Sequence, residues 1–381
     1  MGHTIAIDLG TCNTSVAVLE HDQPQVLYTS EGARVTPAFV AFVDGERVLV
    51  GAAAKRQAIM NPRQTVYGLK GLVGRRYESP EVQRLQQQLS FELVPSGTGD
   101  VRVRVGDREY DPEEIQSVLL HRMRRMAEQY LDAEIAGAYL TVPAHFNAAQ
   151  RNKTREAAKR AGLKVRGLLS EATAAAVWAG SHRRRVRHVA VVDVGGTLDV
   201  TILGGEAGTL QTRAARHDPT LGGEAFDWRI VKRLYELLRV CHDLDVKGDA
   251  VALQRLRDAA ERAKQALSEQ EAVAISLPAL GTGAADAIDL QHRLTRPELE
   301  SLTQDLVDRI GEPCAAALRQ AGVTPADVGE LVVCGGMAHV PAVRARIEAV
   351  FEQPAVPLTS PEEAVVLGAV VLSHPMGGAG G

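Results

Sequence analysis

The sequence contains few cysteines and few aromatic residues for its length. Only four of its 381 residues are cysteines, at positions 12, 241, 314 and 334, and none belongs to a Cys-x-x-Cys pair. Isolated cysteines with no histidine cluster beside them argue against a zinc site and against a small disulfide-rich fold. Aromatic residues make up 4% of the chain, and we find no aromatic-rich segment of the kind that a sugar site would need.

Long apolar runs and an excess of one charge are also missing. The formal net charge is −4, so no basic field favours nucleic acid or an anionic membrane. The first residues lead directly into a strand-like run rather than a signal sequence, and no uncharged stretch is long enough to cross a bilayer. We therefore expect a monomeric cytoplasmic protein that contacts neither nucleic acid nor membrane.

Two similar hairpins open the two halves of the chain. Residues 3–18 and 188–202 each contain an apolar strand that ends in Asp, a short Gly/Thr turn and a second strand. A repeated unit of this kind predicts a duplicated architecture of two lobes.

Strands and helices alternate between and after these hairpins, which predicts an α/β fold. The pattern predicts helices at 112–131, 147–161, 171–180, 224–242, 250–270, 296–321 and from Pro341 onward. It predicts strands at 138–142, 272–294 and 331–334, and short strands within 34–50 around an Asp44-Gly45 turn. The charged segment 181–187 is a sensible lobe boundary.

The two Gly/Thr turns are suited to phosphate. Small residues let backbone N–H groups approach phosphate oxygens, and Thr hydroxyls add donors. An Asp beside phosphate requires a cation between them, and hydrated Mg²⁺ suits that position. One such turn is no more than an ordinary turn, but two matching turns favour a nucleotide held between the lobes. A third turn at Gly335-Gly336 is by itself only a strand-to-helix turn.

Eight sequence blocks resemble the nucleotide-binding domain of the seventy-kilodalton heat-shock (DnaK-type) chaperones, in the order and near the spacing of that family. They span roughly residues 3–373: IDLGT (7–11), GAAAKRQ (51–57), LKGLVGRR (69–76), TVPAHF (141–146), EATAAA (171–176), LGGEAFD (221–227), AERAK (260–264) and PEEAV (361–365). The resemblance implies an actin-like ATPase fold, with two lobes each built on a ribonuclease-H-like sheet and a nucleotide cleft between them.

The resemblance also implies a role for each matching residue. Asp8 and Asp193 would hold hydrated Mg²⁺, and Asp8 with Asp199 could bind K⁺. Lys70 would stabilise transition-state charge, Glu171 would orient or activate the attacking water, and Thr197 and Asp193 complete the catalytic set. Contacts to ATP or ADP are implied for Gly10, Thr11, Cys12, Gly195, Gly196, Gly222, Gly223, Glu261, Lys264, Ser268, Gly335, Gly336 and Glu362.

Ordinary structural roles remain open for some of these residues. Glu261, Lys264 and Ser268 share one helix face, and a solvated face with a salt bridge would show the same spacing. Without the resemblance, Lys70 reads as a surface lysine and Glu171 as an acid placed at a helix N-terminus.

The resemblance predicts the following domain limits. Lobe I covers 1–184 with a smaller subdomain at about 37–111, and lobe II covers 185–375 with a smaller subdomain at about 224–298. A final helix at about 361–373 packs back toward lobe I, and residues 376–381 form a flexible tail.

Two departures from the family pattern affect the predicted chemistry. The second turn has two glycines where the family has three, which could displace Thr197 and Asp199 by up to ~3.5 Å. Misplacement of that size slows phosphoryl transfer strongly, so we expect slow hydrolysis. Cys12 stands where the family usually has a second Thr, and a thiol is a weaker donor than a hydroxyl.

These observations leave several functions open. The first is a slow Mg²⁺-dependent ATPase coupled to lobe closure, without a peptide-binding domain, because the chain ends about where the family's linker begins. The second is a nucleotide-state sensor or regulatory binding module; an actin-like filament protein and a sugar kinase fit the blocks less well. The implied partners are a co-chaperone, an exchange factor or a separate effector protein.

Overall fold

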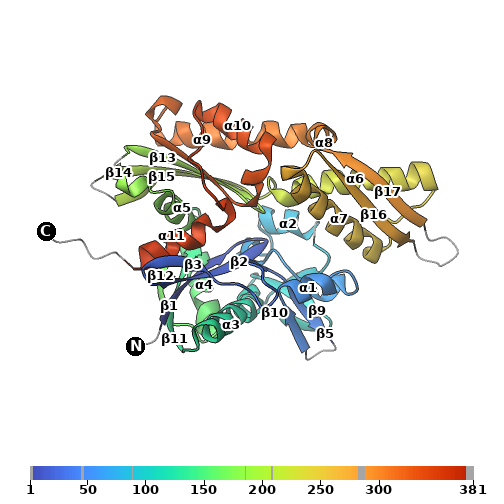
Figure 1. Cartoon of the computed structure of the whole chain (residues 1–381). Coiled ribbons are helices and arrows are strands. Elements are labelled where there is room, and N and C mark those ends of the chain that lie inside the picture. The colour runs from blue at the N-terminus through green and yellow to red at the C-terminus, as the bar shows by residue number, and fades with distance from the viewer. Residues whose placement is uncertain are drawn as a thin grey trace.

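The computed structural model describes residues 3–43, 47–87, 89–184, 186–206, 209–281 and 288–374. The predicted Asp44-Gly45 turn and the predicted tail at 376–381 lie outside these residues. Two large sheets lie one above the other, and the first and second halves of the chain each supply one of them (Figure 1).

The first sheet contains the N-terminal hairpin. Its strand order is β12-β11-β1-β2-β3, and β4 pairs with β2. The hairpin strands β1 and β2 are antiparallel, and β11 lies parallel to β1 on its other side. The strands are β1 (His3–Leu9), β2 (Asn13–Glu20), β3 (Gln23–Val26), β4 (Thr36–Pro37), β11 (Ile135–Val142) and β12 (Val165–Ser170).

The second sheet repeats this arrangement. Its order is β15-β14-β13-β18, with β14 antiparallel and β18 parallel to β13. Each sheet thus centres on one strand that has an antiparallel hairpin partner on one side and a parallel strand on the other. The strands are β13 (His188–Val194), β14 (Leu198–Glu206), β15 (Thr209–Asp218) and β18 (Glu330–Cys334).

Two helices lie between the sheets. Helix α5 (Glu171–Trp178) packs against α11 (Ala364–Ser373), and α11 also contacts β1, β2 and β11 of the first sheet. Their approach is close, because a Cβ on Gly368 would stand 1.8 Å from the backbone oxygen of Ala174. Small side chains at this crossing let the helix pair join the two sheets through one apolar cluster.

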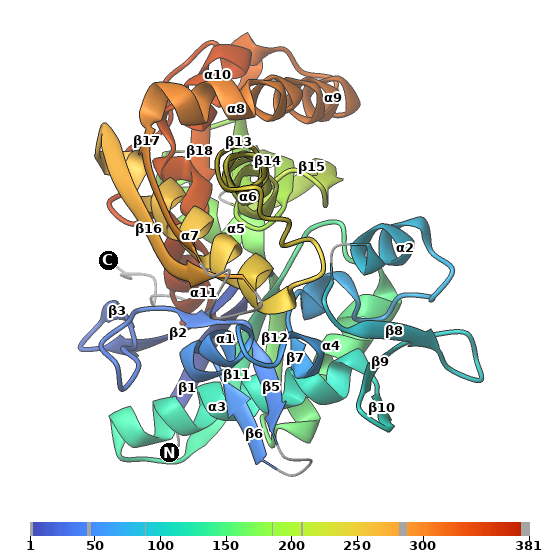
Figure 2. The same cartoon turned by 90° about the vertical axis from the view of Figure 1, so that its right-hand side faces the viewer.

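Smaller elements extend from each half and face one another across a gap between the ribbons (Figure 2). In the first half these are α1 (Ala52–Gln57), α2 (Pro80–Gln86) and two three-stranded sheets, β6-β5-β7 and β10-β9-β8. In the second half α6 (Gly223–His242), α7 (Ala250–Glu269), β16 (Ala272–Leu280) and β17 (Ile288–Thr295) share a separate core. The small strands are β5 (Val40–Val43), β6 (Arg47–Val50), β7 (Thr65–Val66), β8 (Glu92–Pro95), β9 (Val101–Val105) and β10 (Arg108–Tyr110).

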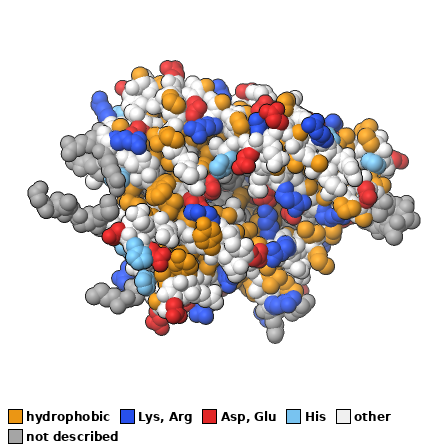
Figure 3. All heavy atoms as spheres, viewed as in Figure 1, with side chains coloured by type: hydrophobic (Ala, Val, Ile, Leu, Met, Phe, Trp, Pro, Cys, Tyr) orange, Lys and Arg blue, Asp and Glu red, His pale blue; other side chains and the backbone are white. Residues whose placement is uncertain are grey.

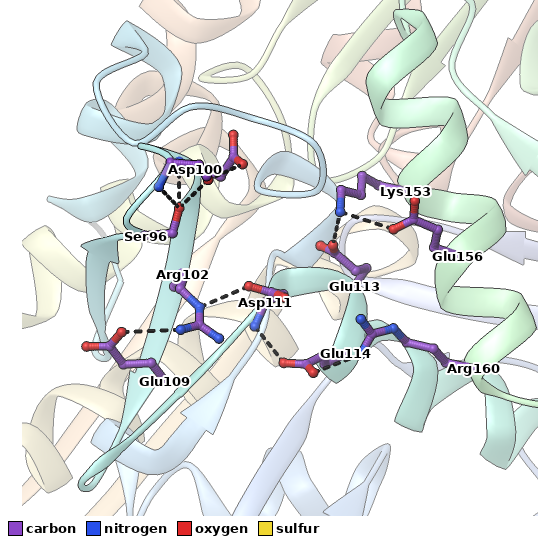
Figure 4. Close-up of polar contacts among 11 residues, drawn as sticks. Ser96, Asp100, Arg102, Glu109, Asp111, Glu113, Glu114, Lys153, Glu156 and Arg160 are labelled. Atoms are coloured by element: carbon purple, nitrogen blue, oxygen red, sulfur yellow. Dashed lines mark hydrogen bonds and ion pairs between the residues drawn. The ribbon is translucent and has the colours of Figure 1, made fainter.

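Ion pairs join α3 (Pro112–Leu131) to α4 (Ala148–Arg160) (Figure 4). Lys153 of α4 lies 2.6 Å from Glu113, which is buried at the start of α3. Arg160 reaches Glu114 at 2.8 Å, and the Glu114 carboxylate also accepts the Asp111 backbone N–H as part of a capping box. These contacts fix the start of α3 against its neighbouring helix.

Most predicted elements are confirmed, the predicted β stretch at 272–294 contains two strands, β16 and β17, and one helix is corrected. The predicted helix at 296–321 is two helices, α8 (Arg296–Arg309) and α9 (Gly311–Ala321). Pro313 explains the break, because its ring lacks an N–H and would clash with the carbonyl of Arg309 in a continuous helix. In α9 the proline lies in the first turn, where it is tolerated. The predicted helix from Pro341 is α10 (Pro341–Phe351).

The exposed surface mixes charges of both signs. On the face shown in Figure 3, Lys and Arg side chains are interspersed with Asp and Glu. Among the described residues, none of the helices combines the length and the apolar character that a bilayer span would need.

Candidate functional site

The two hairpin turns lie at the ends of their strands with an aspartate beside each. In β1–β2 Asp8 pairs with Ser15 across the ladder, and Gly10 begins the turn. A Cβ on Gly10 would stand 2.3 Å from the Asn13 oxygen, so this turn requires glycine. In β13–β14 Asp193 pairs directly with Asp199.

The second turn is tight and touches the first. Residues 195–197 link β13 to β14, and the Gly195 N–H donates to the Thr197 oxygen at 3.0 Å. A Cβ on Gly196 would lie 2.6 Å from the Cys12 thiol, and one on Gly222 would lie 2.1 Å from the Gly196 oxygen. The two turns therefore face each other closely because Gly196 lacks a side chain at their contact, and Gly222 leaves room for the second turn from behind.

The Cys12 thiol is held in its protonated form. Burial raises its pKa, and the neighbouring Glu224 carboxylate, to which the thiol donates at 3.8 Å, raises it further. Since the thiolate is the nucleophilic and readily oxidised form, Cys12 acts here as a weak hydrogen-bond donor.

The third glycine turn lies against the second aspartate. Gly335 follows β18, has a positive φ of 82°, and donates its N–H to the Pro361 oxygen at 3.1 Å. A Cβ at this position would stand 2.5 Å from Asp193 Oδ1. Beyond this turn His339 and Glu362 pair at 2.8 Å.

Lys70 Nζ and Glu171 Oε1 lie 2.8 Å apart inside the cleft, where Lys70 donates a hydrogen bond to Glu171. Glu171 begins α5, where the helix dipole favours a carboxylate. Burial nevertheless raises the Glu171 pKa to about 8, against the opposing effect of Lys70. Burial alone would lower the Lys70 pKa, but Glu171 and Asp8 outweigh it and raise that pKa.

Asp8 and Asp193 are two buried carboxyls of the cleft, with Lys70 as a nearby cation. Burial raises the pKa of both carboxyls, and the Asp199 charge helps raise that of Asp193 to about 7. Thr141 donates a hydrogen bond to Asp8. Two desolvated carboxylates beside N–H-rich turns fit a hydrated Mg²⁺, which prefers oxygen ligands and keeps several waters.

Asp199 differs because its carboxylate is already surrounded by donors. It accepts hydrogen bonds from His145 Nδ1 at 2.9 Å, His217 Nδ1 at 3.2 Å and Thr197 Oγ1 at 3.2 Å. Burial would raise the Asp199 pKa, but the two histidine hydrogen bonds outweigh burial and lower it. The K⁺ ligation that the resemblance implies for Asp8 and Asp199 stays a prediction, and at Asp199 it would have to displace these donors.

Helix α7, in the second half of the chain, lines the side of the cleft that faces α1 of the first half. Lys264 is buried and donates to the Gly223 oxygen at 3.0 Å and to Asp227 at 2.9 Å, so it is anchored to α6. Glu261 pairs with Lys55 of α1 at 2.5 Å, across the gap between the two halves. The predicted shared face of α7 thus points into the cleft rather than into open solvent.

One cavity of about 410 Å³ collects the predicted residues. All of them except Gly222 line it, although they come from segments throughout the chain: Asp8, Gly10, Thr11, Cys12, Lys70, Glu171, Asp193, Gly195, Gly196, Thr197, Asp199, Gly223, Glu261, Lys264, Ser268, Gly335, Gly336 and Glu362. Gly222 lies behind the second turn and supports it.

Sequence reasoning did not identify several residues that also line this cavity. Glu224 and Asp227 belong to the block at 221–227, so their place in that motif could have indicated them. Lys55 belongs to the block at 51–57, which could have indicated it in the same way, whereas Phe39 carries no comparable local signal.

The chain was compared with models of known protein families. A family model described as "Hsp70 protein" matches residues 4–379, which is nearly the whole chain and includes every residue of the cavity. The match agrees with the paired sheets, the two facing turns and the cleft between them. The chain therefore belongs to the Hsp70 family of ATP-binding, chaperone-type ATPases and has the actin-like ATPase fold of that family.

Proposed function

We propose that this chain binds Mg²⁺-ATP in the cleft and hydrolyses it slowly, and that hydrolysis is coupled to closure of the two lobes. The observation that carries the proposal is one cavity that is lined by predicted residues from both halves of the chain. A ligand that touches both halves binds the closed arrangement best and therefore favours it.

The two hairpin turns would hold the phosphates. Gly10, Thr11 and Cys12 approach from one lobe and Gly195, Gly196 and Thr197 from the other, so backbone N–H groups can meet phosphate oxygens from two sides. Asp8 and Asp193 would hold hydrated Mg²⁺, which neutralises charge on the phosphates when it is bound. The ribose and the base would bind between the third glycine turn, α7 and Glu362. K⁺ at Asp8 and Asp199 remains a further prediction of the resemblance, and it would have to displace the hydrogen-bond donors around Asp199.

Lys70 and Glu171 would act on the terminal phosphate and the attacking water. The Lys70 ammonium is held 2.8 Å from Glu171 and keeps its charge, so it can stabilise the developing negative charge of the transition state. Glu171 can accept a proton from water only as a carboxylate, and its pKa of about 8 limits that form near neutral pH.

Two features support slow turnover. Glu171 is mostly protonated near neutral pH, and the second turn has one glycine fewer than the family pattern. The same features favour a second candidate, a nucleotide-state sensor that binds ATP or ADP without useful hydrolysis. In either case the partner classes are those of the family: co-chaperones and exchange factors, or a separate effector protein.

Single-turnover hydrolysis of bound ATP separates the two candidates. The wild-type chain is compared with Lys70→Ala and with Lys159→Ala, which removes an exposed lysine on α4. We expect Mg²⁺-ATP binding in all three and a hydrolysis rate that falls only in Lys70→Ala. Equal rates in the wild type and Lys70→Ala would leave only the sensor, and failure of the wild type to bind nucleotide would refute both.

A further inference from the structure

Two histidines and an aspartate meet beside the second phosphate turn. In the described part of the chain, one group of three potential metal ligands has its donor atoms within 4.8 Å of one another: His145, Asp199 and His217. Asp199 and His217 are direct partners in the β14–β15 ladder, so the sheet register places them together. His145 comes from the loop after β11 in the first half of the chain.

The donor atoms already stand near metal-site spacing. The distance from His145 Nδ1 to Asp199 Oδ1 is 2.9 Å, and His217 Nδ1 lies 3.2 Å from each Asp199 oxygen. With metal–nitrogen and metal–oxygen bonds of about 2.0–2.2 Å, neighbouring ligands of a tetrahedral zinc ion lie roughly 3.3–3.5 Å apart. Small outward shifts of the side chains would admit an ion between them.

The cluster is accessible to solvent. The side chains of His145, Asp199 and His217 are 20%, 20% and 18% exposed, and they line a cavity together with Thr11, Lys70 and Thr197. An ion here would therefore keep an open coordination position that faces the phosphate end of the cleft. The two imidazole rings stack with centroids 3.9 Å apart and planes at 22°, so the rings must tilt apart as the ion enters.

We propose that His145, Asp199 and His217 form a binding site for Zn²⁺, and that the bound ion clamps the two lobes together. Two imidazole nitrogens and one carboxylate oxygen suit zinc and similar transition ions, whereas Mg²⁺ and K⁺ prefer oxygen. On binding, the proton on each Nδ1 moves to Nε2, so both rings remain neutral and each presents a lone pair to the ion. The oxygen-only pair Asp8 and Asp193 remains a separate site for Mg²⁺.

An ion at this site would hold the two lobes together because its ligands belong to both of them. Asp199 and His217 belong to the second sheet, and His145 belongs to the first half of the chain. An ion that binds all three holds the closed arrangement and releases the cleft only after a ligand bond breaks. We therefore expect Zn²⁺ to slow the release of a nucleotide from the cleft.

Cobalt titration tests the site without nucleotide. Metal-free protein is titrated with Co²⁺ in excess Mg²⁺, and the visible absorption of protein-bound Co²⁺ reports nitrogen ligation. We expect one strongly bound Co²⁺ per chain that is displaced by Zn²⁺. His145→Gln and His217→Gln keep an amide donor for Asp199 but remove a metal ligand, so each should weaken binding at least about 100-fold. His121→Gln, at an exposed histidine on α3, should leave binding unchanged.

Two results are decisive: one tests whether the metal site exists, and the other tests whether the bound ion holds the lobes closed. Unchanged Co²⁺ affinity in His145→Gln and His217→Gln, or no nitrogen-ligated Co²⁺ in the wild type, would overturn the site. The clamp is tested by release of a fluorescent ATP analogue, a measurement that rests on the proposed nucleotide binding, whereas the Co²⁺ titration does not. Release slowed by Zn²⁺ in the wild type but not in His145→Gln supports the clamp, and release unaffected by Zn²⁺ in a chain that binds Co²⁺ refutes it.

Discussion

Hydrolysis should accelerate steeply as the pH rises from about 6.5 to 8.5, because Glu171 must lose a proton before it can activate water. Burial in the cleft raises the Glu171 pKa to about 8 although Lys70 lies 2.8 Å away. With that pKa, about 3% of the chains carry a Glu171 carboxylate at the lower pH and about 76% at the higher one. The predicted increase in rate is therefore about 25-fold.

The assay is single-turnover hydrolysis at ATP concentrations well below saturation, because kcat/KM reports the groups of the free enzyme. Glu171→Gln should lower the rate and remove its rise with pH. Glu156→Gln, at an exposed position on α4, should keep both the rate and its rise. A flat wild-type profile, or an equal rise in Glu171→Gln, would refute the assignment of Glu171 as the group that accepts the proton.

The same pKa shift predicts an effect on stability that does not depend on catalysis. The folded-state pKa of Glu171 lies above its ordinary value of 4.5, so folding binds a proton at this site. The stabilisation is fully present below the unfolded-state pKa and is lost as pH rises through the folded-state pKa of about 8. Thermal unfolding of Glu171→Gln should therefore lack the part of the fall in Tm that Glu171 causes in the wild type as the pH rises from about 4.5 to about 8.

Three further predictions concern the turns and the closure of the cleft. One glycine inserted after Gly196 should raise the single-turnover rate by about 10- to 100-fold if the short turn misplaces the catalytic groups, and an unchanged rate would show that the turn is not limiting. Gly222→Ala should destabilise the fold by about 1–3 kcal/mol and weaken ATP binding, because its Cβ would lie 2.1 Å from the Gly196 oxygen; Gly248→Ala, where a Cβ meets nothing within 4 Å, is the control in thermal melts. Lys55→Met should speed ATP release by about 1.5- to 5-fold in stopped-flow measurements, because the partly exposed Lys55–Glu261 pair spans the cleft and is worth about 0.2–1 kcal/mol; an unchanged release rate would contradict a latch at this contact.

The duplicated hairpins were predictable because each carries its own local signal. An apolar run, an aspartate and a glycine turn recur in the same order, and both hairpins form the expected antiparallel pairs. Strand β9 was missed although its pattern is informative, since Val101, Val103 and Val105 are buried and alternate with arginines. Strand β15 offered no such signal, because Ala214 is its only fully buried residue among ten. An edge strand with one buried position has no apolar period to detect.

The cluster of His145, Asp199 and His217 could not be predicted from the order of residues along the chain. The scarcity of cysteines and the lack of a histidine cluster in the sequence argued against a zinc site, and that argument considered only local spacing. Asp199 lies 18 residues from His217 and 54 from His145, and these separations match no local metal motif. One contact depends on the register of β14 with β15, and the other depends on how the first half of the chain meets the second. Metal ligands that come from different lobes therefore produce no local sequence motif. Because such ligands approach one another only when the lobes are closed, binding of an ion to them would depend on whether the lobes are open or closed.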